Sequence, residues 1–113
     1  MKQHKDIYRL KHMLVHAREA HELVAGKERE RLSRDRLLEL ALVRLVEIIG
    51  EAASKVSPEG KQLFPSIPWR EVVNMRNRLI HGYDSIDLDV LWDTIDVDLP
   101  ELITILEDIL NEI

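Results

Sequence analysis

One short segment of the sequence concentrates the side chains that could do chemistry. Residues 69–83 read WREVVNMRNRLIHGY and hold Arg76, Asn77, His81 and Tyr83. A guanidinium stays protonated and offers a planar fork of donors that suits phosphate. A histidine gains or loses its proton near neutral pH. These residue types together indicate a site that binds a phosphate and moves protons.

The spacing predicts a helix over about residues 68–81 in which Arg76 projects from the middle of an apolar arc. The apolar neighbours of Arg76 on the helical wheel are Trp69, Val72, Val73, Leu79 and Ile80. A guanidinium in such surroundings needs an anion or carbonyl groups beside it. Two interpretations are open. One is a structural ion pair with a carboxylate of the preceding helix, for which Glu47 and Glu51 are the candidates, and the other is an open phosphate site.

His81 lies about 140° from Arg76 on a straight helix, so the two side chains do not converge within one regular helix. They can meet if Gly82 loosens the last turn, or if a second copy of the helix completes the site. Two-fold symmetry places two copies of a small motif face to face. The geometry therefore favours a symmetric homodimer, whereas the alternative for His81 is a simple contact with the helix dipole at a C-terminus.

The rest of the chain carries apolar residues at helical spacing almost throughout, which predicts an all-α bundle of four or five helices. The expected helices cover about residues 5–25, 34–56, 68–81 and 88–96, followed by a fifth with Pro100 in its first turn and Leu102, Leu106, Ile109, Leu110 and Ile113 facing inward. Ser33 is the expected N-cap of the second helix and Asp87 that of the fourth. Ser57 and Pro58 have the cap-then-proline order of one additional short turn.

The helix over residues 34–56 has more apolar surface than one core contact requires. Its main apolar face is followed around the helix by a second stripe made of Leu40, Val43, Val46 and Gly50. A helix that is apolar nearly all round is buried on both sides. We therefore expect the second stripe to form a subunit interface, with Gly50 permitting close approach; the alternative is that it faces the short helix of the same chain.

Composition bounds the function classes. A chain of 113 residues is expected to form one domain, residues 1–113. The absence of cysteine excludes a disulfide scaffold and a thiol nucleophile, and neither a signal sequence nor a membrane span is evident, so we expect a cytoplasmic protein.

The two halves of the chain differ in charge. Residues 1–56 carry 12 Lys and Arg against 9 Asp and Glu, and residues 57–113 carry 4 Lys and Arg against 12 Asp and Glu. A nucleic-acid binder of the simple basic-patch kind is thus disfavoured, and any RNA contact is expected near Arg76 and Arg78.

The spacing of three residues resembles the RX4HXY motif of the HepT-like branch of HEPN domains. Four residues separate Arg76 from His81, and one residue separates His81 from Tyr83. The flanking segments EIIGEAASKVS and PSIPWREVVNMRNRLIHGYDSIDLDVLWDTIDVDLPEL are similar to that family too, so the resemblance covers most of residues 35–110. It implies an up-and-down HEPN-type helical bundle that forms homodimers.

The resemblance also implies a function. HepT-like proteins are endoribonuclease toxins of type VII toxin–antitoxin modules and cleave RNA without a metal or other cofactor. In that reading Arg76 and His81 are catalytic, Asn77 and Tyr83 support them, and a cognate minimal nucleotidyltransferase silences the toxin by AMPylation of Tyr83. The expected partners are RNA, the antitoxin and a second copy, with no DNA and no membrane. The alternative is a non-catalytic helical dimer that binds a nucleotidyltransferase or its nucleotide.

Two further polar groups are better explained without a metal. His12 and His16 are four residues apart on the first helix, but no carboxylate completes a zinc-ligand set. The aspartates between Asp84 and Asp93 lack the glycine and the final glutamate of a calcium-binding loop. We expect no metal site in this chain.

Overall fold

The computed structural model describes residues 2–113, and this part of the chain is helical with no strand. The elements in order are α1 (Lys2–Leu23), the 3₁₀ turn η1 (Arg29–Ser33), α2 (Arg36–Ser54), α3 (Pro58–Leu63), α4 (Trp69–Val73), α5 (Met75–Leu79), α6 (Leu88–Asp93), the π-helical turn η2 (Thr94–Asp98) and α7 (Leu99–Glu112). The predicted all-α class is confirmed.

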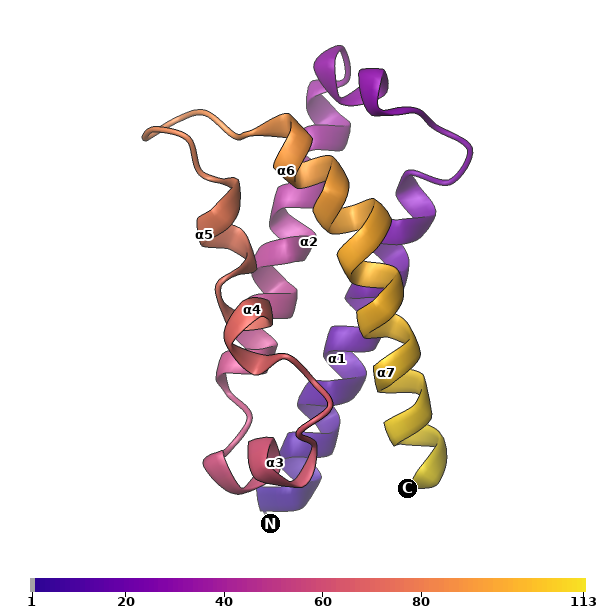
Figure 1. Cartoon of the computed structure of the whole chain (residues 1–113), viewed down its shortest axis with the longest axis vertical. Helices are drawn as coiled ribbons and strands as arrows, with labels where there is room; N and C mark the ends of the chain where they lie inside the picture. The colour runs from indigo at the N-terminus through magenta and orange to yellow at the C-terminus, as the bar shows by residue number, and fades with distance from the viewer. Residues whose placement is uncertain (1) are drawn as a thin grey trace.

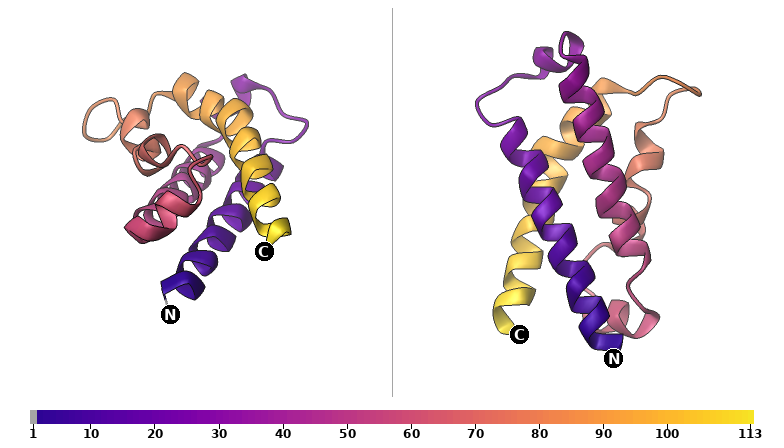
Figure 2. Two further views of the ribbon diagram at one scale, coloured as in Figure 1. Left: turned by 60° about the horizontal axis from the view of Figure 1, so that its bottom comes forward. Right: turned by 180° about the vertical axis from the view of Figure 1, so that it is seen from behind.

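The long helix α1 lies in the middle of the bundle. It packs along α2 on one side and along α7 on the other, while α4 and α5 pack on α2 (Figures 1 and 2). One apolar cluster joins these helices, and its members that are completely shielded from solvent include Leu10, Met13, Leu42, Val46, Ile49, Leu79, Ile95, Leu99 and Leu106. The short helices that carry the motif are thus fixed to the bundle chiefly through α2.

Asp35, not Ser33, is the N-cap of α2, so the predicted cap is wrong. The Asp35 carboxylate accepts a hydrogen bond from the Leu38 amide at 3.0 Å, and this bond is the main reason why the pKa of Asp35 lies below its ordinary value. Ser33 is instead the last residue of η1, where its hydroxyl accepts a bond from Arg29 at 3.0 Å. The buried Leu32 holds η1 against the core, which delays the start of α2 by two residues.

Ser57 begins α3 as predicted, with Pro58 in the first turn. Its hydroxyl accepts a hydrogen bond from the Gly60 amide at 3.0 Å. The buried carboxylate of Asp6 in α1 in turn accepts bonds from the Ser57 amide at 2.9 Å and from the Ser57 hydroxyl at 2.6 Å. This small network ties the beginning of the chain to the connection that follows α2.

The second apolar stripe of α2 is used partly within the chain. Val46 and Gly50 are buried, and a Cβ atom placed on Gly50 would lie 3.3 Å from the carbonyl oxygen of Val72 in α4. Gly50 therefore permits the close approach of α4, and the expectation that it serves a subunit interface is wrong. Only the end of the stripe nearest the start of α2 remains open, where Leu37 and Leu40 are exposed.

Residues 88–112 form one continuous helical rod rather than two separate helices. Asp87 caps its start as predicted, by accepting bonds from the amides of Asp89 and Val90 at 3.1 Å. Pro100 lacks an amide hydrogen, which removes one helical bond, and the π-helical turn η2 directly precedes α7 and absorbs the irregularity. Leu102 and Leu106 face the core as expected, whereas Ile113 is exposed.

Candidate active site

The motif does not lie on one straight helix. The predicted helix over residues 68–81 is interrupted at Asn74, which separates α4 from α5, and α5 ends at Leu79. The Asn74 side-chain amide donates to the carbonyl of Arg70 at 2.9 Å. The Asn74 backbone amide donates to the same carbonyl at 3.1 Å and the Arg78 amide donates to the Asn74 carbonyl at 3.3 Å, so the break is short and helical bonds run across it.

His81 and Tyr83 therefore lie in the loop over residues 80–86, not in a helix. The loop is closed like a narrow hairpin: Ile80 and Ile86 form an isolated antiparallel bridge, and the His81 amide donates to the carbonyl of Ser85 at 2.9 Å. Gly82 has a φ of +98°, a conformation that favours glycine. The loop projects from the bundle between α5 and α6 (Figure 1), and the Tyr83 side chain is fully exposed.

Arg76 does not project from the middle of an apolar arc. The buried residues of this region are Val72, Met75 and Leu79, and Arg76 lies at the edge of that row with 49% of its side chain exposed. The buried residues keep the three- and four-residue spacing of a regular helix, and the helical wheel misplaced Arg76 because it left Met75 out of the apolar arc.

Arg76 forms an ion pair with Glu47, as one of the two interpretations of its sequence position predicted. Its Nε lies 2.6 Å from Oε2 of Glu47 in α2. The other oxygen of Glu47 lies 3.6 Å from Arg44, and Arg44 also lies 3.5 Å from Glu51. The carboxylate of Glu47 is thus shared between two guanidinium groups on a surface open to solvent, and the pair is not sealed in the core.

Arg76 lies between two surface pockets. One, of about 220 Å³, is lined by Arg76 and Tyr83 together with Arg36, Glu39, Leu40, Val43 and the loop residues Ile80, Gly82, Asp84, Ser85 and Ile86. The other, of about 150 Å³, is lined by Arg76, Asn77, Glu47, Gly50, Glu51, Ser54 and Val73. The motif residues Tyr83 and Asn77 are thus on opposite sides of Arg76.

His81 is exposed and lines neither of these pockets. Its imidazole has no hydrogen-bond or ionic partner among the described residues, since the bonds at this position use its backbone. Within one chain the structure brings Arg76 and Tyr83 to a common pocket, and His81 is not among the residues that line it. Sequence reasoning missed Arg36, which lines that pocket from the first turn of α2 and lies 40 positions before Arg76.

Within residues 2–113 no three His, Asp or Glu side chains gather in a way that could hold a metal ion. His16 Nδ1 lies 2.7 Å from the carbonyl oxygen of His12, an ordinary contact along a helix. None of the described helices combines the length and the apolar character that crossing a membrane requires.

Known proteins resemble this chain over much of its length. It is 46% identical over 68 residues to a probable ribonuclease HepT of Thermococcus cleftensis, which is 60% of this chain and 62% of that protein. It is 35% identical over 103 residues to a candidate RNase of Caldanaerobacter subterraneus, which is 91% of this chain and 92% of that protein. A candidate RNase of Methanocaldococcus jannaschii is 38% identical over 68 residues, or 60% of this chain and 62% of that protein.

The chain thus spans less than two thirds of the Thermococcus and Methanocaldococcus proteins and nearly all of the Caldanaerobacter protein. No solved structure was found that matches it. The sequence profile of the family described as "Ribonuclease HepT-like" matches residues 4–109, which include the whole motif and every helix that positions it. The chain therefore belongs to the HepT-like ribonuclease family.

Proposed function

We propose that this HepT-like ribonuclease cleaves RNA without a metal ion, at a site that two copies of the chain build together from Arg76 and His81. We further propose that it is the toxin of a type VII toxin–antitoxin module, neutralised when a minimal nucleotidyltransferase transfers AMP to Tyr83. One observation carries the proposal. Arg76 and Tyr83 line a common open pocket, and His81 lies exposed on the adjoining loop.

Arg76 is suited to bind the scissile phosphate. Its ion pair with Glu47 is on the surface, where such pairs contribute only about 0.2–1 kcal/mol, so an incoming phosphate can replace the carboxylate at small cost. Arg36 reaches the same pocket from α2 and adds a second positive charge to it. Arg36 pairs with Glu39 at 3.0 Å, and Glu39 and Asp84 line the pocket as well, so a bound phosphate would replace the carboxylate partners of the two guanidinium groups.

A second copy supplies what one chain lacks. Leu40 and Ile80 are exposed, and both line the pocket that contains Arg76. Apolar side chains gathered at one place on a surface are typical of protein interfaces. We propose that this surface forms a two-fold interface, because such symmetry would place a second His81 opposite the first motif.

The chemistry needs two proton transfers. One His81 would accept the proton of a ribose 2′-hydroxyl while that oxygen attacks the adjacent phosphorus, and the other would donate a proton to the departing 5′-oxygen. Arg76 would stabilise the negative charge that develops on the phosphorus oxygens. The P–O5′ bond breaks as the O2′–P bond forms, so the products are a 2′,3′-cyclic phosphate and a 5′-hydroxyl.

Tyr83 is the proposed acceptor of the AMP group. Its side chain is fully exposed at the tip of the loop over residues 80–86. Its phenol oxygen would attack the α-phosphorus of ATP held by the nucleotidyltransferase, with release of pyrophosphate. The attached AMP would then fill the pocket beside Arg76 and put a phosphate where the substrate phosphate binds.

The test uses purified protein and RNA in the presence of a chelator. We expect the parent chain to cleave RNA and Arg76→Ala and His81→Ala to lose at least about a hundredfold in rate, since each removes a charge-stabilising or proton-transferring group. Arg70→Ala is the matched control, because Arg70 is an exposed arginine of α4 that lines neither pocket. Equal rates for parent and both motif variants would refute catalysis by this site and leave a non-catalytic binding module.

A mixed-dimer experiment tests the two-copy site. If the site needs one His81 from each copy, a mixed dimer of a parent chain and a His81→Ala chain should be inactive, so the activity of such mixtures should fall with the square of the parent fraction. Activity that falls only in proportion to the parent fraction, in mixtures shown to contain mixed dimers, would contradict a site shared between subunits.

A further inference from the structure

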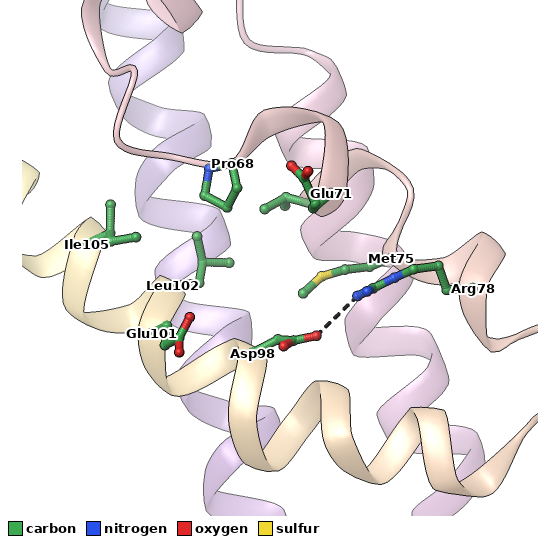
Figure 3. A pocket seen from close by; sticks show the side chains of 9 residues that line it. Pro68, Glu71, Met75, Arg78, Asp98, Glu101, Leu102 and Ile105 are labelled. Carbon is green, nitrogen blue, oxygen red and sulfur yellow. Dashed lines mark hydrogen bonds and ion pairs between the residues drawn. The ribbon is translucent and has the colours of Figure 1, made fainter.

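A groove lies on the side of the bundle away from the motif loop. It contains two pockets between α7 and the part of the chain that runs from α3 to α5. The upper pocket, of about 250 Å³, is lined by Pro68, Glu71, Val72, Met75, Arg78, Asp98, Glu101, Leu102 and Ile105 (Figure 3). The lower one, of about 210 Å³, is lined by Asp6, Ile7, Gly60, Leu63, Phe64 and Ile113.

The groove lies between two parts of the chain that pack on different helices. α4 and α5 pack on α2, whereas α7 packs on α1 (Figure 1). The ion pair of Arg78 with Asp98, at 3.1 Å, spans the upper pocket between α5 and the rod (Figure 3).

Both pockets are lined mainly by apolar side chains beside α7. Leu102 and Ile105 of α7 line the upper pocket, and Ile113, which directly follows the end of α7, lines the lower one. Leu102 and the last residue of α7, Glu112, are 10 positions apart, which corresponds to about 15 Å along the helix. Two apolar pockets at that separation match apolar side chains three turns apart on an amphipathic helix lying along the groove.

The rim of the groove is negatively charged and therefore favours a positively charged occupant. Glu101, Asp108 and Glu112 form an exposed row on α7 beside the apolar strip, and Glu71 lies across the upper pocket from them. None of these four carboxylates has an ionic or hydrogen-bond partner among the described residues, while the nearby Arg78 is already paired with Asp98. Such a rim attracts cations and repels a phosphate backbone.

We propose that this groove docks an amphipathic helical segment of a partner protein, with apolar side chains in the two pockets and lysine or arginine side chains along the rim. The alkyl stems of lysine and arginine can cover apolar surface while their charged ends meet the carboxylates. The inference does not depend on RNA cleavage, because no lining residue of either pocket belongs to Arg76, Asn77, His81 or Tyr83.

The test is a ¹H–¹⁵N NMR titration of the full chain with a synthetic peptide of about fourteen leucines and lysines, whose leucines follow helical spacing along one face. We expect the backbone amide signals of Val72, Met75, Leu102 and Ile105 to move. A peptide with glutamate at every lysine position should move them at least about tenfold less effectively, because the rim is acidic.

A pair of variants separates this groove from general charge attraction. Glu71→Lys combined with Glu101→Lys should weaken peptide binding by about tenfold or more. Glu19→Lys combined with Glu22→Lys changes the net charge equally on exposed positions of α1 outside both pockets and should leave binding within about twofold. The amide spectrum of each variant shows whether it is folded, and the mapping on the parent chain stands without the variants.

Several results would contradict the proposed docking of a basic amphipathic helix. Equal binding of the lysine and glutamate peptides, movement of signals elsewhere, or equal weakening by both variant pairs would overturn the proposal. It would also be overturned if the same signals moved on concentrating the chain alone, which would mean that a second copy covers the groove. Movement of these signals by a short RNA in place of the peptide would overturn it as well.

Discussion

Arg76 Nε lies 2.6 Å from Glu47 Oε2, so the guanidinium of the motif is oriented by a carboxylate of α2 before any phosphate arrives. Glu47 holds Arg76 in place and at the same time neutralises it. A phosphate that approaches Arg76 must replace this carboxylate or share the guanidinium with it.

Replacing Glu47 by glutamine should strengthen RNA binding. Glutamine keeps a carbonyl oxygen that can accept from Arg76 but removes the negative charge that competes with phosphate. We expect the dissociation constant for a short RNA, measured by fluorescence anisotropy at low salt, to fall by about three- to tenfold.

Glu51→Gln is the control for that measurement, because Glu51 lines the same pocket as Glu47 but lies near Arg44 rather than Arg76. Its effect should be smaller than that of Glu47→Gln and should disappear first as salt is raised. Weaker RNA binding by Glu47→Gln than by the parent would mean that Glu47 acts mainly by orienting Arg76.

A methyl group at Gly50 should loosen the attachment of α4 to α2. In Gly50→Ala the new Cβ would lie 3.3 Å from the Val72 carbonyl oxygen and 3.4 Å from that of Val73, and backbone atoms can yield only if α4 moves. Crowding of this kind costs about 1–3 kcal/mol, and the helix preference of alanine over glycine offsets about 1 kcal/mol of it. We expect a net loss of about 1 kcal/mol in the free energy of unfolding by urea.

Ser54→Ala, at an exposed position one turn later on α2, provides the comparison and should change stability by less than about 0.5 kcal/mol. If Gly50→Ala were as stable as the parent or more so, α4 would have to be free to shift on α2.

The helix content and most helix starts could be predicted from the sequence because they depend on local signals. Apolar spacing and the capping residues Ser57 and Asp87 act over three or four positions, and the structure agrees with them. Ser33 failed as a cap because Leu32 is buried against distant helices, and such a long-range contact leaves no local mark.

The residues of the site could be predicted from the sequence, but their arrangement in space could not. The motif named Arg76, His81 and Tyr83, and Glu47 was one of two candidates for the ion pair that the structure contains. The helical wheel failed for Arg76 because it left the buried Met75 out of the apolar arc, and it failed for His81 and Tyr83 because α5 ends at Leu79. Arg36 could not be predicted as a lining residue, because its place in the pocket depends on how α2 and the loop pack.

Asp6 should be important for stability although it lies far from the motif. Its buried carboxylate accepts from both the amide and the hydroxyl of Ser57, and Asp6→Ala would leave these donors without their acceptor. Buried groups left unpaired cost about 1–3 kcal/mol. Chemical denaturation should show a loss in that range, whereas Asp108→Ala, at an exposed position of α7, should change stability by less than about 0.5 kcal/mol.

A double-mutant cycle assigns that loss to the contact itself. If Asp6 acts through Ser57, the combination of Asp6→Ala and Ser57→Ala should cost less than the sum of the two single changes by about 1 kcal/mol. Strict additivity would show that Asp6 stabilises the chain through other groups.

The cap of α2 should make stability depend on pH in the acid range. The hydrogen bond from the Leu38 amide lowers the pKa of Asp35 below its ordinary value of 3.8 in the folded chain, so the unfolded chain binds a proton at Asp35 more readily. The stabilising effect is therefore fully present above the unfolded pKa and is lost as pH falls through the lower, folded value. Asp35→Asn keeps a side-chain oxygen that can cap the helix but cannot titrate. The difference in unfolding free energy between the parent and Asp35→Asn should thus be constant near neutral pH and shift against the parent below about pH 4. The other carboxylates titrate alike in both proteins and cancel in this difference, so a difference that does not change with pH would show that the Leu38 amide does not favour the ionised form of Asp35.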